Sequence, residues 1–176
     1  YDYSNAEYDY MNQPYYTLAK TSKVAVITEP YYDPTSGMNM SSCSMPIIDE
    51  AGTFLGCVTV DIELGTIQNM VDSIKIGEGG SAILVGATGV YLGGVESELV
   101  ENYGKITEDS NESLAKAGKI IMADVDGMTT YVKDGNTYHL YYSTLSELGW
   151  KLMIQIPQTE LNQPVSLLLV KLIIVC

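Results

Sequence analysis

Residues 28–33 read Thr-Glu-Pro-Tyr-Tyr-Asp, residues 44–47 read Ser-Met-Pro-Ile, and residues 52–61 read Gly-Thr-Phe-Leu-Gly-Cys-Val-Thr-Val-Asp. The last two stretches belong to one predicted β-hairpin, with strands Met40–Ile48 and Thr53–Ile62 around a turn at 49–52. We interpret the three stretches as strands of one sheet that carry acidic and aromatic side chains towards a common pocket.

Alternation along the second hairpin strand separates two faces of the sheet. One face carries Leu55, Cys57, Thr59 and Asp61, and the other carries Phe54, Val58, Val60 and Ile62. We expect the Phe54 face to be core and the mixed Asp61 face to line a pocket.

Two of the three cysteines, Cys43 and Cys57, lie on the two hairpin strands. If Ile48 pairs with Thr53, their thiols point to opposite faces of the sheet and cannot form a disulfide. We therefore expect two small core residues. A one-residue bulge would change this register.

Short elements surround the hairpin. Tyr15–Lys20 predicts a helical turn after Pro14, and Val24–Thr28 predicts a strand. After the hairpin, apolar residues at 64, 67, 70, 71 and 74 predict a helix over Glu63–Ile76. The glycine-rich run at 77–80 ends this helix and begins a linker.

Residues 81–158 predict a second, smaller module. Its expected strands are Ser81–Val85, Val90–Leu92, Met128–Val132, Thr137–Ser143 and Gly149–Ile156. A capping box at 109–112 predicts a helix from Ser110 to Ala117 that ends before Gly118. Antiparallel strands with segregated helices indicate an α+β fold. The predicted parts are a first module at 1–62, a connecting helix and linker at 63–80, the second module at 81–158, and a final segment at 159–176.

The final segment is apolar from 165 to 176, apart from Ser166 and Lys171. Twelve helical residues rise about 18 Å, whereas a bilayer core needs about 20 residues. We interpret the run as the start of a transmembrane helix cut by the end of a fragment. The alternative is a helix that ends the domain, which the lysine favours because a charge within a membrane is costly.

Composition excludes several classes of partner and chemistry. The formal charge of −13 argues against nucleic acid and anionic membrane surfaces. All nine basic residues are lysines, so no guanidinium is available to bind a carboxylate through two parallel hydrogen bonds. His139 is the only histidine, and neither a zinc site nor a nucleophile–base pair is evident. We expect no catalytic residue, metal or cofactor, and hence no enzyme.

Tyrosine is concentrated near the start of the chain. Eight of the fourteen tyrosines fall within residues 1–32, beside Glu29, Asp33 and Asp61. A phenol ring offers a rigid apolar face with a polar tip, and its face attracts cations. The cluster favours a small-molecule pocket, although any single tyrosine could equally fill a half-buried surface. Asp61 could also cap the helix that follows it.

The order and spacing of several motifs resemble the double Cache sensor domain of bacterial methyl-accepting chemotaxis receptors and sensor histidine kinases. Gln13–Tyr16, the 28–33 and 45–47 stretches and 56–61 resemble its distal module. The segments 81–91, 134–143 and 149–152 resemble its proximal module. The resemblance implies two PAS-like Cache modules with antiparallel sheets, joined by a helix. The family's long N-terminal helix is missing, which suggests a fragment.

The resemblance also implies a ligand site in the distal module. Tyr8, Tyr15, Tyr16, Tyr31 and Asp61 match positions that hold an amino-acid ligand in the family, and Gln13 stands where an arginine is usual. Asp33 lies in the same cluster. The half that binds an amine is retained and the half that binds a carboxylate is not. A cationic amine or a neutral polar ligand is therefore expected.

The resemblance, together with the apolar run at the C-terminus, thus implies the extracellular domain of a transmembrane chemoreceptor in the cell membrane, anchored through its C-terminal helix and acting as a homodimer. Its expected ligand is an amine, an amino acid or another small metabolite. A sensor histidine kinase or diguanylate cyclase is the alternative output. An adhesion or scaffold module without a small ligand is the alternative from another class.

Overall fold

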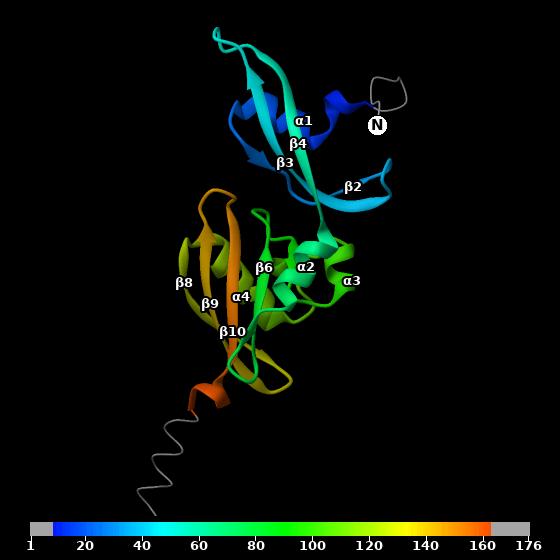
Figure 1. The fold of residues 1–176 in the computed structure, drawn as a ribbon. Helices are drawn as coiled ribbons and strands as arrows, with labels where there is room; N and C mark the ends of the chain where they lie inside the picture. The colour runs from blue at the N-terminus through cyan, green and yellow to red at the C-terminus, as the bar shows by residue number, and fades with distance from the viewer. Residues whose placement is uncertain (1–8, 163–176) are drawn as a thin grey trace, which may run out of the picture. The chain divides into compact units, whose positions relative to one another are not determined.

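The computed structural model describes residues 9–162. The chain folds into two compact units, with the boundary between Thr66 and Ile67. Each unit holds one antiparallel sheet and its own helices, which confirms the predicted α+β fold class (Figure 1).

The first unit is built on one long hairpin. Its elements are the 3₁₀ turn η1 (Tyr10–Asn12), helix α1 (Pro14–Ser22) and strands β1 (Val26–Ile27), β2 (Tyr31–Asp33), β3 (Met38–Ile48) and β4 (Phe54–Glu63). Strand β3 is central, because β4 pairs with one edge while β1 and β2 pair with successive parts of the other. The predicted hairpin is therefore present, with β3 starting before its expected first residue, Met40.

Helix α1 covers one face of this hairpin. Pro14 stands at its first position, where the missing N–H costs nothing. Lys23 ends the helix in the left-handed conformation, with φ 56°, and its N–H donates to Ala19 O. Ala19 is fully buried, and the Tyr16 ring packs edge-on against Phe54 with centroids 5.3 Å apart. The side chains of α1 that point towards the hairpin therefore form one wall of the space between the helix and the sheet.

The register of the hairpin differs from the prediction by two residues. Cys43 pairs with Val60 and Cys57 pairs with Pro46, and the pairing shifts at a bulge between Ile47 and Ile48. Beyond the bulge, a shift of two residues leaves each side chain on its predicted face, so the thiols still point apart and both are free. Cys43 is exposed and Cys57 is half-buried, so the expectation of two core cysteines is wrong.

The expectation that the Phe54 face is core is also wrong beyond the bulge. Val58 and Val60 are 59% and 63% exposed, and Met45 and Ile47 on β3 are exposed beside them. Phe54 precedes the bulge and packs under α1. Alternation showed which side chains share a face beyond the bulge, but the bulge breaks the alternation at Phe54, and the position of α1 determines which face is covered.

Helix α2 (Leu64–Asp72) follows β4, and it ends before Ile76, the last residue of the predicted helix. Leu64, Ile67 and Val71 are buried, whereas Met70 is 66% exposed and does not belong to the buried stripe. The missing C-terminal turn is replaced by strand β5 (Lys75–Ile76), which pairs with β6 through Lys75 and Ser81. Pairing along the sheet edge thus replaces the last helical hydrogen bonds.

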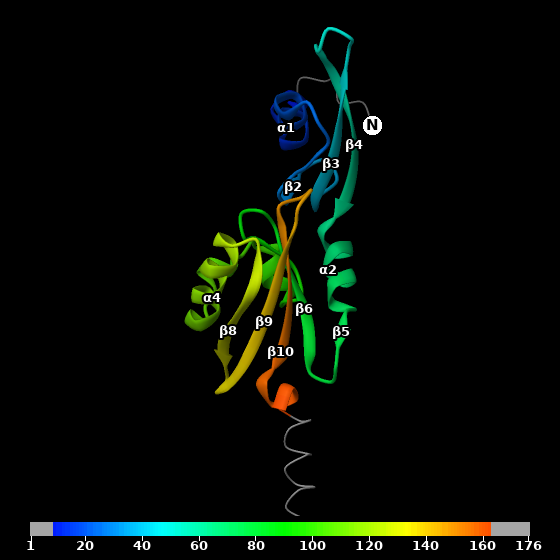
Figure 2. The same cartoon turned by 90° about the vertical axis from the view of Figure 1, so that its left-hand side faces the viewer.

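The second unit is a larger antiparallel sheet. Its further strands are β6 (Gly80–Val85), β7 (Tyr91–Gly93), β8 (Asp126–Lys133), β9 (Asn136–Leu145) and β10 (Trp150–Pro157). The order is β5-β6-β10-β9-β8, with β7 also paired to β6. Helices α3 (Ser97–Glu101), η2 (Ile106–Glu108) and α4 (Glu112–Ala123) lie between β7 and β8 in the chain, and α4 lies against one face of the sheet (Figure 2).

The start and end of α4 differ from the prediction. Asn111 is the N-cap, since its side-chain oxygen accepts from the backbone N–H groups of Ser113 and Leu114. The helix runs through Gly118, where a Cβ would lie 2.7 Å from Ile106 O. Gly118 therefore allows a close approach of η2 and does not end the helix. Asp109, the predicted cap, accepts instead from the Tyr91 hydroxyl.

A buried tyrosine in this unit makes its stability sensitive to alkaline pH. Burial, followed by the nearby Tyr138 and Asp109, raises the pKa of Tyr131 to about 12. The unfolded chain loses this proton near pH 10. Between about pH 10 and 12 the folded state therefore binds more protons, so the free energy of unfolding should fall as pH rises.

This decline should be shallower in Tyr131→Phe than in the wild type. Urea unfolding can be followed by the fluorescence of Trp150, the single tryptophan, which is 6% exposed and lies in this unit. The two proteins share every other ionisable group, so the difference between the two pH slopes is the informative quantity. Identical slopes would contradict a raised pKa at Tyr131.

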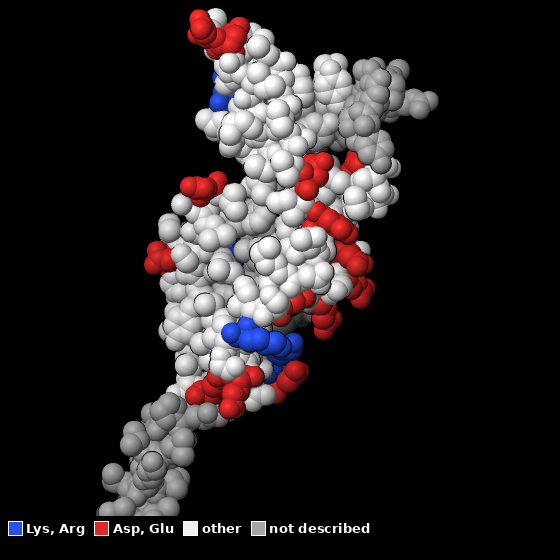
Figure 3. All heavy atoms as spheres, in the orientation of Figure 1, with Lys and Arg blue, Asp and Glu red and all other residues white. Residues whose placement is uncertain are grey.

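Acidic side chains mark the surface of each unit separately. On the face that Figure 3 shows, Asp and Glu side chains occur on both units, with a few lysines between them. This surface is in keeping with the formal charge of −13. Such a surface repels polyanions.

Beyond β10, residues 158–162 form a helical turn. The apolar run at 165–176 lies outside the described residues, as does the predicted start of a transmembrane helix. Within residues 9–162, none of the helices combines the length and apolar character required to cross a membrane.

Candidate functional site

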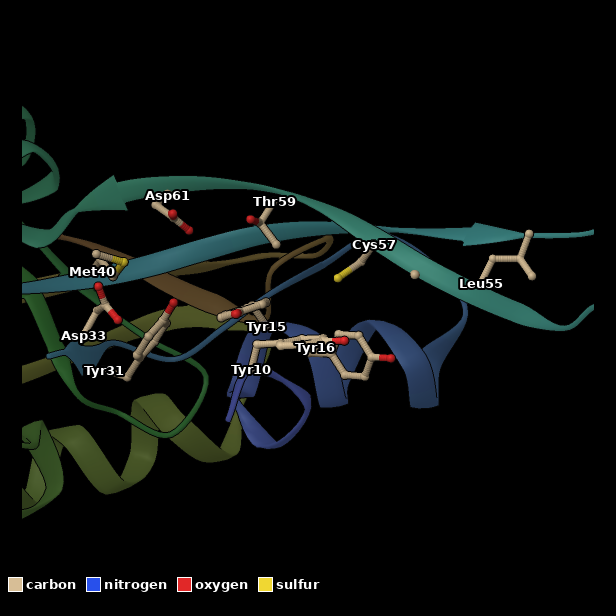
Figure 4. A pocket seen from close by; sticks show the side chains of 11 residues that line it. Tyr10, Tyr15, Tyr16, Tyr31, Asp33, Met40, Leu55, Cys57, Thr59 and Asp61 are labelled. Atoms are coloured by element: carbon tan, nitrogen blue, oxygen red, sulfur yellow. The ribbon is translucent and has the colours of Figure 1, made fainter. Parts of the chain in front are cut away.

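A cavity of about 460 Å³ lies within the first unit, between α1 and the hairpin (Figure 4). Its lining residues are Tyr10, Tyr15, Tyr16, Tyr31, Asp33, Met40, Leu55, Gly56, Cys57, Thr59 and Asp61. The two aspartates and Tyr31 gather at one end, and Tyr16 and Cys57 lie towards the other (Figure 4). The volume suits a small metabolite.

A chain of hydrogen bonds orders the acidic end. The Ser42 hydroxyl donates to Asp61 Oδ1 at 2.6 Å. Since a serine has only one hydroxyl proton, the Tyr31 hydroxyl, 2.7 Å from Ser42 Oγ, must be the donor in that second pair. Ser42 itself is fully buried, and its backbone N–H donates to Thr28 Oγ1. The chain Tyr31–Ser42–Asp61 therefore holds one carboxylate oxygen in place.

The other Asp61 oxygen, Oδ2, accepts no hydrogen bond from any residue in the described range. Asp61 is exposed, and Figure 4 shows its carboxylate on the same side of the hairpin as the tyrosines. The second carboxylate at this end, Asp33, is 6% exposed and accepts from the Ser36 backbone N–H. A ligand with hydrogen-bond donors can therefore reach an ordered, accessible acceptor.

The Tyr31 phenol stays protonated at neutral pH. Burial raises its pKa most, the hydrogen bond with Ser42 lowers it, and the charges of Asp61 and Asp33 raise it. The net direction of the pKa change is upward. Tyr31 is therefore a stable donor to Ser42, and the negative charge at this end belongs to the carboxylates.

The aromatic end is built by edge-on packing. The Tyr10 and Tyr16 ring centroids are 5.4 Å apart with an interplanar angle of 81°. The Lys20 ammonium lies 5.9 Å from the centroid of the Tyr16 ring, but Lys20 does not line the cavity. Burial raises the pKa of the Cys57 thiol, which favours its neutral form. None of the described lining residues is cationic.

The structure brings most of the sequence-predicted site residues together. Tyr15, Tyr16, Tyr31, Asp33 and Asp61 line one cavity. Gln13 precedes α1 and does not line the cavity, and Tyr8 lies outside the described residues. The alternative role of Asp61 as a helix cap does not fit, because its side chain bonds to Ser42 and α2 begins at Leu64.

The cavity also contains residues outside the predicted set of ligand-binding residues. Thr59 and Cys57 line it, as expected for the Asp61 face, and Tyr10 belongs to the tyrosine cluster, so the sequence carried a signal for each. Met40 and Ser42 gave no such signal. Met40 belongs to the site because β2 pairs with β3, which places Met40 opposite Tyr31. Ser42 belongs to it because it pairs with Asp61 across the hairpin.

Comparison with known proteins gives one family. The family model described as a Cache domain matches residues 2–165. The methyl-accepting chemotaxis protein McpC of Bacillus subtilis is 31% identical over 157 residues, which are 88% of this chain and 22% of that protein. PctB of Pseudomonas aeruginosa, also a methyl-accepting chemotaxis protein, is 25% identical over 88% of this chain and 24% of its own length. The chain thus spans about a quarter or less of these relatives.

Solved structures share the fold. The histidine kinase extracellular domain mmHK1S-Z3 superposes with a TM-score of 0.76 at 26% identity, over 90% of this chain and 58% of that one. The ligand-binding domain of the Pseudomonas fluorescens chemoreceptor CtaA, in complex with L-alanine, gives a TM-score of 0.69 at 23% identity, over 89% and 64%. The ligand-binding domain of PctB in complex with L-Arg gives 0.68 at 22% identity, over 88% and 63%.

Proposed function

Because the chain belongs to the Cache domain family, we propose that it is the extracellular ligand-sensing domain of a transmembrane chemoreceptor. In this proposal the first unit binds a small cationic or neutral polar ligand. The observation that carries it is the cavity of the first unit, with two carboxylates and Tyr31 at one end and no cationic residue among its described lining.

The charge of the cavity favours a ligand with an ammonium group. Asp61 presents an oxygen without a partner among the described residues, at a position fixed by Ser42. A charge-assisted hydrogen bond to this oxygen contributes about 1.5–3 kcal/mol. The neighbouring tyrosine rings add about 0.5–2 kcal/mol where their faces meet the cation. Both contributions are specific to positive or hydrogen-bond-donating groups.

The comparison structures bear on ligand class. CtaA and PctB were solved with L-alanine and L-Arg, each of which carries an ammonium group. This chain has no arginine and no cationic residue is found in the described lining, so a ligand carboxylate would have hydroxyl groups, backbone N–H groups or water as its partners. We therefore expect amines and neutral polar compounds to bind better than dicarboxylates.

We further propose that the first unit is membrane-distal and the second membrane-proximal, and that the second unit transmits the signal instead of binding the ligand. The receptor would be anchored in the cell membrane after residue 162 and act as a homodimer. A sensor histidine kinase is the second candidate output, because the extracellular domain mmHK1S-Z3 resembles this chain over 90% of its length. The type of cytoplasmic output domain in the receptor distinguishes the two candidates.

Isothermal titration calorimetry of the 176-residue chain tests the ligand class. The probes are ethanolamine, L-alanine, L-arginine and succinate at equal ionic strength. We expect at least one ammonium compound to bind, and hydrogen exchange should then show greater amide protection around Tyr31 and Asp61. Tighter binding of succinate than of every amine would overturn the proposed class. Binding of none of the probes would favour the scaffold alternative.

A further inference from the structure

The turn between β5 and β6 holds a carboxylate from the far end of the chain. Glu160 Oε1 accepts from the backbone N–H of Glu78 at 2.8 Å, and its Oε2 accepts from that of Gly79 at 2.9 Å. The partners are 82 and 81 residues apart in sequence. Both carboxylate oxygens are thus engaged by successive backbone donors, an arrangement that favours an anion.

The glycines of this turn leave the room that the carboxylate occupies. Gly77 has φ +61°, and a Cβ there would lie 1.7 Å from Glu160 Oε1. A Cβ at Gly79 would lie 3.1 Å from Pro157 Cγ, and one at Gly80 would lie 2.5 Å from Ile76 O. Any side chain at Gly77 would displace the carboxylate. The run Gly-Glu-Gly-Gly, which the sequence predicted to begin a linker, therefore also forms the binding site of the Glu160 carboxylate.

The two partners of this contact stand at opposite ends of the second unit in sequence. The turn follows β5, and β5 follows α2, the helix through which the chain passes from the first unit to the second. Glu160 lies in the helical turn at 158–162 that follows β10 (Figure 2). A second contact holds the helical turn at 158–162 in place, since the Gln158 side chain hydrogen-bonds to the His139 ring on β9.

We infer that Glu160 is a positioning residue that couples the incoming connection of the second unit, α2 with β5, to the segment that leaves its sheet. A displacement of α2 moves β5 and its turn, and the two hydrogen bonds pass this displacement to residues 158–162. The role of this coupling in signalling rests on the proposed sensing function. The contact and the coupling are nevertheless testable without any ligand.

Amide hydrogen exchange of the ligand-free chain tests the contact. In Glu160→Ala, the exchange of the Glu78 and Gly79 amides and of residues 158–162 should rise at least about tenfold, because two charge-assisted bonds are lost. Gly77→Ala should have the same effect, and the double variant should add less than about twofold, since both changes remove one contact. Glu147→Gln is the control, as Glu147 is exposed and has no hydrogen bond to the described residues. Unchanged exchange in Glu160→Ala, or effects of the two variants that multiply, would overturn the contact.

A second arm tests the coupling. Asp72 at the end of α2 accepts from the Gly94 backbone N–H at 2.9 Å, so Asp72→Ala loosens α2 without touching Glu160. Exchange at 158–162 should then rise in the wild-type background and not rise further in Glu160→Ala. An equal rise in both backgrounds, or no rise in either, would overturn the coupling. Since no ligand is used, failure here is distinguishable from failure of the proposed ligand site.

Discussion

Replacing Asp61 by asparagine should weaken the binding of an ammonium ligand by about tenfold to a hundredfold. The change removes the negative charge but keeps the shape of the side chain, and the amide oxygen can still accept from Ser42. A hydrogen bond between charged groups contributes about 1.5–3 kcal/mol, and this range sets the expected loss. Calorimetry with the tightest amine found for the wild type measures it.

Two further variants separate the site from general effects of charge. Glu50→Gln removes a charge from an exposed residue in the hairpin turn of the same unit, and it should change affinity less than about twofold. Ser42→Ala removes the group that orients Asp61 and accepts from Tyr31, so it should weaken binding several-fold while the charge remains. An amine that binds Asp61→Asn as well as the wild type would exclude Asp61 from the site. Equal losses in Glu50→Gln would show a nonspecific charge effect.

Replacing Gly94 by alanine should destabilise the second unit by about 2–5 kcal/mol. Gly94 has φ +82°, and a Cβ would lie 2.0 Å from Ala82 O and 2.6 Å from Ile83 Cα, where only backbone movement can relieve the clash. The left-handed conformation costs a non-glycine residue about 1–2 kcal/mol, and overpacking costs about 1–3 kcal/mol more. Urea unfolding followed by Trp150 fluorescence reports this unit, since Trp150 is the single tryptophan.

Gly135 provides the matched control. Its φ is +76°, close to that of Gly94, but a Cβ there would have nothing within 4 Å. Gly135→Ala should therefore cost only about 1–2 kcal/mol, the conformational part alone. Similar losses in the two variants would contradict the close approach of Gly94 to β6.

Local patterns in the sequence determined the elements and the shared faces. Alternation placed Cys57, Thr59 and Asp61 on one side of β4, and the structure has them lining one cavity. Turn residues located the hairpins of both units, and the α+β class followed from their antiparallel pairing. These features depend on residues close in the chain, where the period of the backbone alone fixes side-chain direction. The tyrosine cluster likewise contained Tyr15, Tyr16 and Tyr31 of the candidate site.

Tertiary structure decided what each face meets. Val58 and Val60 are exposed because α1 packs on the opposite face of the hairpin, and no pattern within β4 contains that information. The bulge at Ile47 set the register that brings Ser42 beside Asp61, so the orienting hydroxyl could not be identified beforehand. Gly118 lies within α4, where the absence of a side chain allows η2 to approach the helix closely. The turn at 77–79 binds Glu160, which is 82 residues from Glu78 in the sequence. Such contacts depend on where distant segments come together, which the folding of the whole unit determines.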